Sequence, residues 1–397
     1  MHNAPTTSVP APADVTATAP EWDPRAPEVL RDQIGAYDEL RRRCPVAHSD
    51  YLHWSVLRHA DVLQVLHDPD TFGNGVSTHL SIPNGMDAPE HGPWRALIEP
   101  YFAPARLAAF EPAARAVVRE SLAALPVEGE HDWMAGFAPE CAVRLLCGFM
   151  GWPARMRQPL RDWTLRNQAA TLAGDREALA AIAYDFDGHI RAQLEARRAQ
   201  PPGDDVTSRL LRETIAGRPL RDEELVSIVR NWTVGELSTL GACIGILAQF
   251  LAERPALQAR LRAQPAQLPA AIDEILRIHP PLVSNRRILR CHAKVADQSL
   301  ATGERLTLLW ASANRDEAVF GDPDEFRLDR DPALNLLYGA GVHVCPGAEL
   351  SRLQLRVAME EVLAATRSIE RVAGCEPRRA RYPASGFAAL TLRTVRA

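Results

Sequence analysis

A single cysteine set among glycines, with a helix starting directly after it, constrains this chain more than any other feature. Residues 338–347 read YGAGVHVCPG, and a helical run follows at 348–364. The glycines let the backbone turn close to a flat ligand, because they accept positive φ angles. Backbone N–H groups and the N-terminal end of the helix favour the anionic form of Cys345. The loop therefore predicts a thiolate presented to a metal as an axial ligand.

This loop resembles the heme-binding loop of the cytochrome P450 family, whose usual form is Phe-Gly-x-Gly-x-His-x-Cys-x-Gly. The resemblance implies that Cys345 ligates the iron of heme b, and the other residues that it assigns to the cofactor here are Tyr338, Gly339, His343 and Gly347. Tyr338 departs from the family's phenylalanine, and its hydroxyl can alter the electron density that the sulfur gives to iron. Taken by itself, the loop would equally suit a buried structural cysteine.

The composition excludes several classes of function. With 397 residues and 46% hydrophobic content, the chain can build one large core. A net charge of −5 provides no basic surface for nucleic acid. Seven scattered cysteines without a C-x-x-C motif argue against a disulfide framework and for a reduced compartment. Because we find no apolar segment of roughly 20 residues, we expect a soluble cytoplasmic protein with neither a membrane nor a nucleic-acid partner.

The order of the segments predicts a mainly α domain with a smaller β portion near both termini. Residues 1–25 are rich in proline, alanine and threonine and are expected to form a disordered leader, followed by a single heme domain at 26–397 with the cytochrome P450 fold. Residues 72–89 show little periodicity and predict a long loop, which in the P450 family covers the substrate pocket. Paired helices within 151–199 would form the lid over that pocket.

A helical stretch without proline at 221–252 is the longest in the chain, and it would span about 48 Å. Apolar residues surround its second half, as in a buried helix. In cytochromes P450 such a helix crosses the face of the heme opposite the thiolate, and small residues and an acid–threonine pair kink it. The resemblance places Thr239 at the threonine and Ser238 at the acid, with Gly235 one residue ahead of the family's glycine.

Glu236 takes the place of that glycine and is a candidate for the missing acid. It lies about 60° around the helix from Thr239. Cleavage of the O–O bond requires protons, which serine cannot supply as a carboxylic acid does. We therefore hypothesise that Glu236 provides the acid function, directly or through water. A glutamate hydrogen-bonded to the backbone or facing solvent is the alternative.

Two further motifs resemble those that bind the heme propionates in P450s. His91 and Arg95 are four residues apart and share a helix face, as in the family's His-x-x-x-Arg. Arg287, in a predicted strand at 282–288, matches the family's second arginine, and Arg286 would take that role after a shift of one residue.

A third motif resembles the structural core of the family. Glu274 and Arg277 are three residues apart on one face of a predicted helix. In P450s an arginine from a later segment, here 320–330, completes a buried Glu–Arg–Arg ion network. Such a network is tolerable only when every member is paired, and its role would be to hold the core around the heme loop.

The resemblance implies a monooxygenase that inserts one atom of O2 into a small, largely apolar organic substrate by hydroxylation or oxidative dealkylation. Its electrons would come from a separate ferredoxin-type protein with its reductase, because we find no flavin or iron–sulfur motif. We expect this partner to dock on the Cys345 side, with Arg106 and Arg352 as candidate contacts. The candidate substrate-pocket residues are Phe72, Leu80, Leu240, Val283 and Phe387.

Two alternatives remain open. The first is a peroxygenase that uses H2O2 directly, with a carboxylate near the iron as acid and base; the loss of the family's acid at Ser238 keeps it open. The second is a P450-like binding or recruitment module without oxygen activation, against which Thr239 and Gly235 argue. The substrate, its site of oxidation and the oligomeric state are not specified by the sequence.

Overall fold

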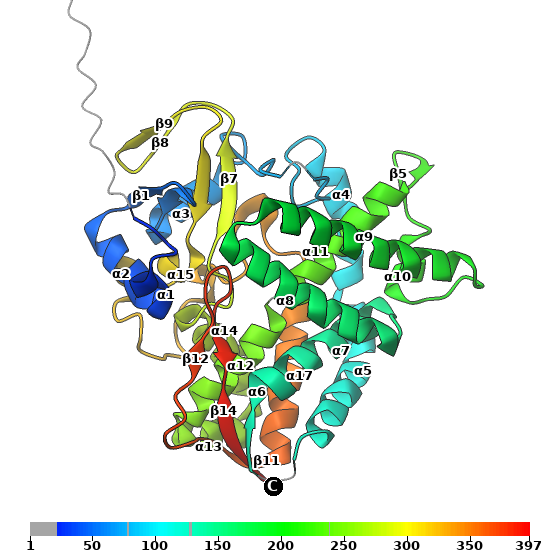
Figure 1. Cartoon of the computed structure of the whole chain (residues 1–397), viewed down its shortest axis with the longest axis vertical. Helices are drawn as coiled ribbons and strands as arrows, with labels where there is room; N and C mark the ends of the chain where they lie inside the picture. Colours follow the sequence, from blue (N-terminus) through cyan, green and yellow to red (C-terminus); the bar gives the residue numbers. More distant parts are fainter. Residues whose placement is uncertain (1–21, 78, 127–128, 238) are drawn as a thin grey trace, which may run out of the picture.

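The computed structural model describes residues 22–77, 79–126, 129–237 and 239–397. This part of the chain is mainly helical, and it has a smaller portion of strands (Figure 1). Strands lie near both ends of the sequence, as expected, but others lie further inside it, at 129–132, 214–219 and 285–308. The predicted fold class is therefore confirmed. Most of the expected leader, residues 1–21, lies outside the described residues. Trp22 already packs edge-on against Tyr37, and its backbone N–H donates to the carbonyl of His48. Residues 22–25 therefore contact the folded body.

Helices predominate in the middle of the chain. The helices are α1 (Pro27–Arg31), α2 (Gln33–Arg43), α3 (His59–His67), α4 (His91–Ile98), α5 (Pro104–Ala123), α6 (Trp133–Gly136), α7 (Ala138–Met150), α8 (Arg157–Ala173), α9 (Arg176–Arg198), α10 (Val206–Leu210), α11 (Asp222–Leu237), α12 (Leu240–Ala252), α13 (Pro255–Ala263), α14 (Leu268–Ile278), α15 (Trp310–Ala313), α16 (Glu317–Phe320) and α17 (Ala348–Ala365). The strands are β1 (Val46–Ser49), β2 (His53–Val56), β3 (Phe72–Gly73), β4 (Gly129–Asp132), β5 (Thr214–Ile215), β6 (Arg218–Pro219), β7 (Asn285–Leu289), β8 (Ala293–Val295), β9 (Gln298–Leu300), β10 (Arg305–Leu308), β11 (Thr366–Arg371), β12 (Arg378–Arg379), β13 (Phe387–Ala389) and β14 (Thr391–Arg396).

The largest sheet has the strand order β1-β2-β10-β7-β3. Strand β10 runs parallel to β2 and antiparallel to β7, where Leu306 pairs with Arg287. Because successive side chains of a strand point to opposite faces, only one of the two neighbouring arginines can face the interior. Arg287 is buried and Arg286 is exposed, so this sheet directs Arg287 inward.

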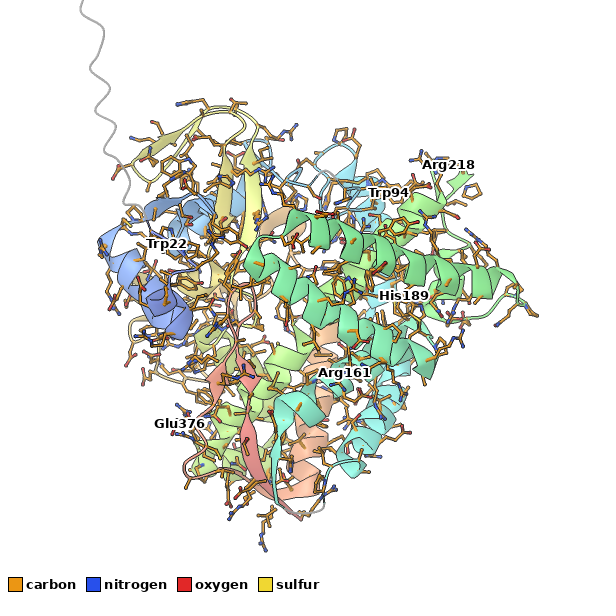
Figure 2. All side chains as sticks on the ribbon, in the orientation of Figure 1. Trp22, Trp94, Arg161, His189, Arg218 and Glu376 are labelled. Carbon is orange, nitrogen blue, oxygen red and sulfur yellow. The ribbon has the colours of Figure 1, made fainter. Side chains whose placement is uncertain are left out.

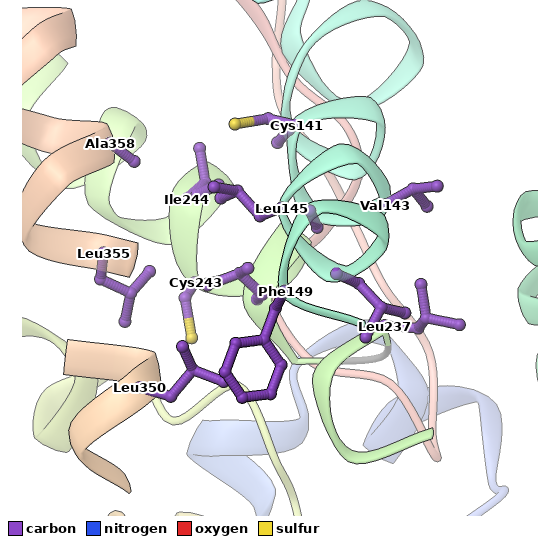
Figure 3. Packing of buried hydrophobic residues seen from close by; sticks show 14 of the residues in the cluster. Cys141, Val143, Leu145, Phe149, Leu237, Cys243, Ile244, Leu350, Leu355 and Ala358 are labelled. Carbon is purple, nitrogen blue, oxygen red and sulfur yellow. The ribbon is translucent and has the colours of Figure 1, made fainter. Parts of the chain in front are cut away.

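The central core forms where α7, α12 and α17 pack together (Figure 3). Cys141 and Leu145 of α7 lie against Ile244 of α12, and Leu355 and Ala358 project from α17 on the other side. Residues 222–252 are apolar and long enough to cross a membrane, contrary to our expectation that no segment is. However, 71% of their apolar window is buried inside the protein, as in the core helix of a globular domain.

The long helix is divided at Thr239, where our prediction of one uninterrupted helix is wrong in detail. Helix α11 ends at Leu237 and α12 begins at Leu240. The hydroxyl of Thr239 donates to the carbonyl of Gly235 at 2.7 Å. In a regular helix, that carbonyl would accept from the backbone N–H of Thr239. That N–H donates to Glu236 instead. The local side-chain hydrogen bond thus competes with the helical ladder. Ser238 lies outside the described residues.

Helices α8 and α9 form the predicted pair and lie in front of α11 in Figure 1. Gly174 ends α8 with φ 68°, a left-handed conformation that glycine adopts without strain. Asp175 then caps α9 by accepting a hydrogen bond from the N–H of Ala178. Trp163 and Phe186 stack between the two helices with ring centroids 4.4 Å apart.

The predicted Glu–Arg–Arg network is confirmed. Glu274 pairs with Arg277 at 2.7 Å and with Arg330 at 2.9 Å, and the Arg277 side chain is 1% exposed. Arg277 also donates to the carbonyls of Asn314 and Pro323. The network thus fastens α14 to the chain that leads towards the cysteine loop.

Candidate active site

A cavity of about 400 Å³ lies between the cysteine loop and the division of the long helix. Ten residues that the sequence singled out, drawn from four separate parts of the chain, line it together. They are His91, Arg95, Gly235, Thr239, Leu240, Arg287, Tyr338, Gly339, His343 and Cys345. Gly347 lies directly behind Cys345, towards which its N–H is directed.

The cysteine loop is fixed by backbone contacts and by close packing. The N–H of Cys345 donates to the carbonyl of Tyr338 at 2.8 Å, which closes the loop. Gly339 and Gly341 have φ angles of 74° and 69°, where other residues would be strained. A Cβ at Gly341 would lie 2.3 Å from the carbonyl oxygen of Leu66 at the end of α3. Position 341 therefore requires glycine, and the loop sits directly on α3.

The surroundings of Cys345 combine burial with cationic and N–H groups. Burial raises the pKa of the Cys345 thiol, while the N–H of Gly347 and the guanidinium groups of Arg95 and Arg352 act in the opposite direction. These groups are the ones that stabilise negative charge on sulfur. The arrangement suits a thiolate that ligates a metal and is shielded from water.

Tyr338 is held by a cation–π contact. The guanidinium of Arg352 lies 4.6 Å from the centre of its ring and pairs with Asp273 at 3.1 Å. Burial, followed by the negative charge of Asp273, raises the pKa of the Tyr338 phenol. The phenol is therefore protonated at neutral pH.

One edge of the cavity gathers buried cationic and N–H groups. Arg287 donates to the carbonyl of Arg286 at 2.7 Å. Arg287 is 3% exposed and forms no ion pair with any described residue. Burial lowers the pKa of its guanidinium to about 10, against a weaker effect of Asp87. The rings of His91 and His343 lie 4.3 Å apart, and the Nε2 atom of His343 is buried with no hydrogen-bond partner among the described residues. Burial and the neighbouring cations lower the pKa of His343 to about 3.

This edge fits the carboxylates of a heme. A buried charge without a counter-ion is costly, and two propionates would provide the missing anions. Arg95 donates to the carbonyl of Val344 at 2.7 Å, which ties α4, the helix that also carries Trp94 (Figure 2), to the cysteine loop. The Nδ2 atom of Asn74 is a further unpartnered buried donor at the cavity. Asn74 is not among the residues predicted from the sequence, because it lies in an irregular loop without a motif.

The opposite wall carries the threonine. The hydroxyl of Thr239 donates its proton to Gly235, so its oxygen remains able to accept a further hydrogen bond from the cavity. Gly235 has no atom within 4 Å of an added Cβ, which shows that the wall is open at this point. The expectation that room is needed at position 235 agrees with this geometry.

Glu236 does not line the cavity. Its carboxylate accepts a hydrogen bond from Nε2 of Gln354, on α17, at 2.6 Å. Burial raises the pKa of the Glu236 carboxyl to about 8, and the hydrogen bond from Gln354 only partly opposes this. The geometry therefore favours our alternative, a hydrogen-bonded glutamate, with a side-chain amide in place of the backbone. The sequence contains no motif that pairs positions 236 and 354.

The expected substrate pocket is only partly found in this cavity. Leu240 lines it, whereas Phe72 and Val283 are each 1% exposed in apolar clusters elsewhere. Leu80 is 42% exposed, and Phe387 lines a neighbouring cleft. Phe72 is buried by packing within the sheet, and Val283 is buried by packing against α2. Such packing buries apolar side chains as effectively as a ligand pocket does, so the sequence pattern alone does not separate the two.

A thiol that faces a cavity with a cationic edge, in a mainly helical fold, defines a heme-thiolate protein. Comparison with known proteins agrees: a family model described as Cytochrome P450 matches residues 157–367. The erythromycin C-12 hydroxylase of Saccharopolyspora erythraea is 31% identical over 84% of this chain and 86% of that enzyme. The cyclomarin C epoxidase CymV of Salinispora arenicola is 30% identical over 81% of this chain and 86% of that enzyme. Among solved structures, a mutant of P450 EryK in complex with erythromycin B has a TM-score of 0.84 at 28% identity, over 92% of this chain and 97% of EryK.

The chain therefore belongs to the cytochrome P450 family. It is a bacterial-type P450 monooxygenase, and its cofactor is heme b. Members of the family act on small organic molecules with O2 and redox partners.

Proposed function

We propose that this enzyme inserts one atom of O2 into a small, largely apolar organic substrate, by hydroxylation or oxidative dealkylation. Its electrons come from a separate ferredoxin-type protein and its reductase, which dock on the Cys345 side through Arg106 and Arg352. The observation that carries the proposal is that Cys345 and Thr239 line one cavity from separate walls. The hydroxylase and epoxidase names of the relatives support oxygen insertion.

The residues of the cysteine loop and of the cationic edge have binding roles in this proposal. Heme b, when bound, supplies the iron centre that activates O2. Cys345 would bind its iron, while Tyr338, Gly339, His343 and Gly347 would enclose the heme. His91, Arg95 and Arg287 would bind its propionates, and the absence of an anionic partner for the buried Arg287 among the described residues supports this role. Gly235, which has no side chain, would leave space next to the heme.

Proton handling belongs to Thr239 and Ser238 in this proposal. The Thr239 hydroxyl can accept a hydrogen bond from one donor in the cavity while it donates to the carbonyl of Gly235. Ser238 keeps the role that the resemblance gives to its position. Glu236 has no part in proton supply in this proposal, because its carboxyl group does not line the cavity and is engaged by Gln354. Its main role is to fasten α11 to α17.

Turnover with isotopically labelled O2 tests the function. A ligand that shifts the spin state of the holoenzyme is first selected from aromatic, terpenoid and fatty-acid panels. With a ferredoxin, its reductase and labelled O2, we expect one labelled oxygen atom in the product. No aspartate or glutamate lines the cavity within the described chain, so H2O2 alone should bleach the heme rather than support turnover. Turnover at low peroxide without any reductase would favour the peroxygenase instead, and no oxidation under either condition would favour the binding module.

The pH dependence of stability tests the role of Glu236. Its pKa is about 8 in the folded protein and near 4.5 in the unfolded chain, so the folded protein binds more protons between these values. Stability therefore falls as the pH rises through this range. Glu236→Gln cannot ionise, and its free energy of unfolding relative to the natural protein should rise by roughly 2 to 4 kcal/mol over the same range. Chemical denaturation at a series of pH values measures this difference.

Glu39→Gln provides the control, because Glu39 is an exposed carboxylate of α2. Its stability difference should stay nearly constant with pH. We also expect Glu236→Gln to keep the ratio of product formed to O2 consumed close to that of the natural enzyme. A strong loss of this coupling would restore Glu236 as the acid, and a flat stability difference would show that its carboxylate is not shielded.

A further inference from the structure

A second cleft, of about 860 Å³, adjoins the heme cavity. Its walls come from α8, from the junction of α11 and α12, from α1 and from the C-terminal segment 377–388. The two spaces share a wall where Leu282, of the heme cavity, forms a β-bridge with Ala384, of the cleft. They also meet at the long helix, since Ala242 lies about 60° around the axis from Thr239. The cleft and the heme cavity are therefore immediate neighbours.

One wall of this cleft is apolar. Val143, Leu172, Leu237 and Phe387 line it together with Leu165, which is 65% exposed on α8. Exposed apolar side chains that are grouped at a concave surface usually mark a binding site, whereas single exposed apolar side chains do not. The cleft thus offers contact area for the apolar body of a ligand.

The rest of the lining is strongly basic. Five arginines line the cleft, and no aspartate or glutamate does so within the described chain. The whole sequence contains 50 acidic and 45 basic residues, so this concentration of positive charge runs against the average. The five are Arg31, Arg161, Arg378, Arg379 and Arg381.

Four of these arginines have no anionic partner in the part of the chain that the structure describes. Arg161, on α8 (Figure 2), pairs with Glu140 at 3.1 Å. The other four form no ion pair with any described residue, and the nearby Glu376 pairs with Arg371 instead. The guanidinium of Arg379 lies 6.0 Å from the centre of the Phe387 ring, which places it beside the apolar wall. Grouped cations in a concave, partly apolar site raise the local concentration of anions.

We infer that this cleft recognises a carboxylate on an otherwise apolar substrate, with the arginines binding the acid group while the apolar body extends into the heme cavity. The inference rests on the proposed function and narrows its substrate class to organic acids. Arginine suits this role because its planar guanidinium binds a carboxylate through two parallel hydrogen bonds. Arg378 and Arg379 form strand β12 and Arg381 follows it, so three of the five positive charges come from one short segment.

Spectral titration of the purified holoenzyme tests the inference with matched ligands. Each aromatic or aliphatic carboxylic acid is compared with its own primary amide, which has nearly the same shape and no charge. At least one acid should bind about tenfold more tightly than its amide, and added salt should weaken the acid alone. In the triple variant Arg378→Gln, Arg379→Gln, Arg381→Gln, the ratio of the two dissociation constants should fall to about one.

Arg43→Gln is the matched control, since Arg43 is an exposed arginine of α2 that lines neither space. It should leave the ratio unchanged. Equal affinity for acids and amides, in protein with a normal thiolate CO spectrum, would overturn the inference and leave the proposed function intact. An abnormal CO spectrum would instead refute the proposed function. If the triple variant kept its ligand ratio but lost turnover only with an acidic donor protein, the arginines would serve that protein and the inference would be wrong.

Discussion

Replacing Cys345 by alanine should abolish turnover and move the CO band of the reduced protein to the blue of the position that gives the family its name. A cysteine thiolate would supply the electron density that heme-thiolate chemistry needs, and the only other thiol among the described residues that line the cavity is that of Cys243. Cys243 also lines the cavity, but it lies on α12. Burial raises the pKa of its thiol far above the usual range, so it stays neutral. The CO difference spectrum of reduced, purified protein measures the effect directly.

Cys243→Ala is the appropriate control for this experiment. It removes the other thiol of the same cavity and changes a similar volume, yet it should leave the CO band in place. An unshifted band in Cys345→Ala, or a lost band in Cys243→Ala, would show that the ligand has been assigned to the wrong sulfur.

The largest loss of stability should follow Glu274→Gln, at about 3 to 5 kcal/mol. The carboxylate of Glu274 accepts from Arg277 and Arg330 and from the backbone N–H of Arg327. Removing its charge leaves two guanidinium groups without their counter-ion in the interior, and one of them is 1% exposed. Chemical denaturation and the fraction of protein that retains heme both report the change.

Asp329→Asn serves as the comparison, because it also removes a carboxylate that pairs with an arginine. Asp329 and Arg327 are 71% and 46% exposed, and their pair is screened by water. This variant should unfold close to the natural protein. Similar losses in the two variants would mean that burial of the Glu274 network contributes little.

The cysteine loop and its partners could be predicted because each carries a motif with a fixed spacing. His91 and Arg95 share a helix face at any orientation of the helix. The alternation of a strand lets only one of Arg286 and Arg287 face the interior, and the observed burial shows that it is Arg287. Glu274 and Arg277 are equally local. In each case, short-range geometry decides which side chains lie together.

The remaining features depend on packing between distant segments. The direction of Glu236 is set by Gln354 on another helix, and no spacing rule links the two. Phe72 and Val283 are apolar in a pattern that suits a pocket and a core alike. The arginine-lined cleft is hidden by the average composition, because segment 378–381 meets α1 and α8 only in the folded chain.

The contact between Gly341 and Leu66 bears on how this enzyme can be recombined with its relatives. The axial cysteine takes its position partly from a helix near the start of the chain, since the loop rests on the last turn of α3 without space for a Cβ. A chimera that exchanges only the later segments would join a foreign cysteine loop to the native α3. Crossover points for such chimeras should therefore keep α3 and the loop from the same parent, even though most of the chain separates them.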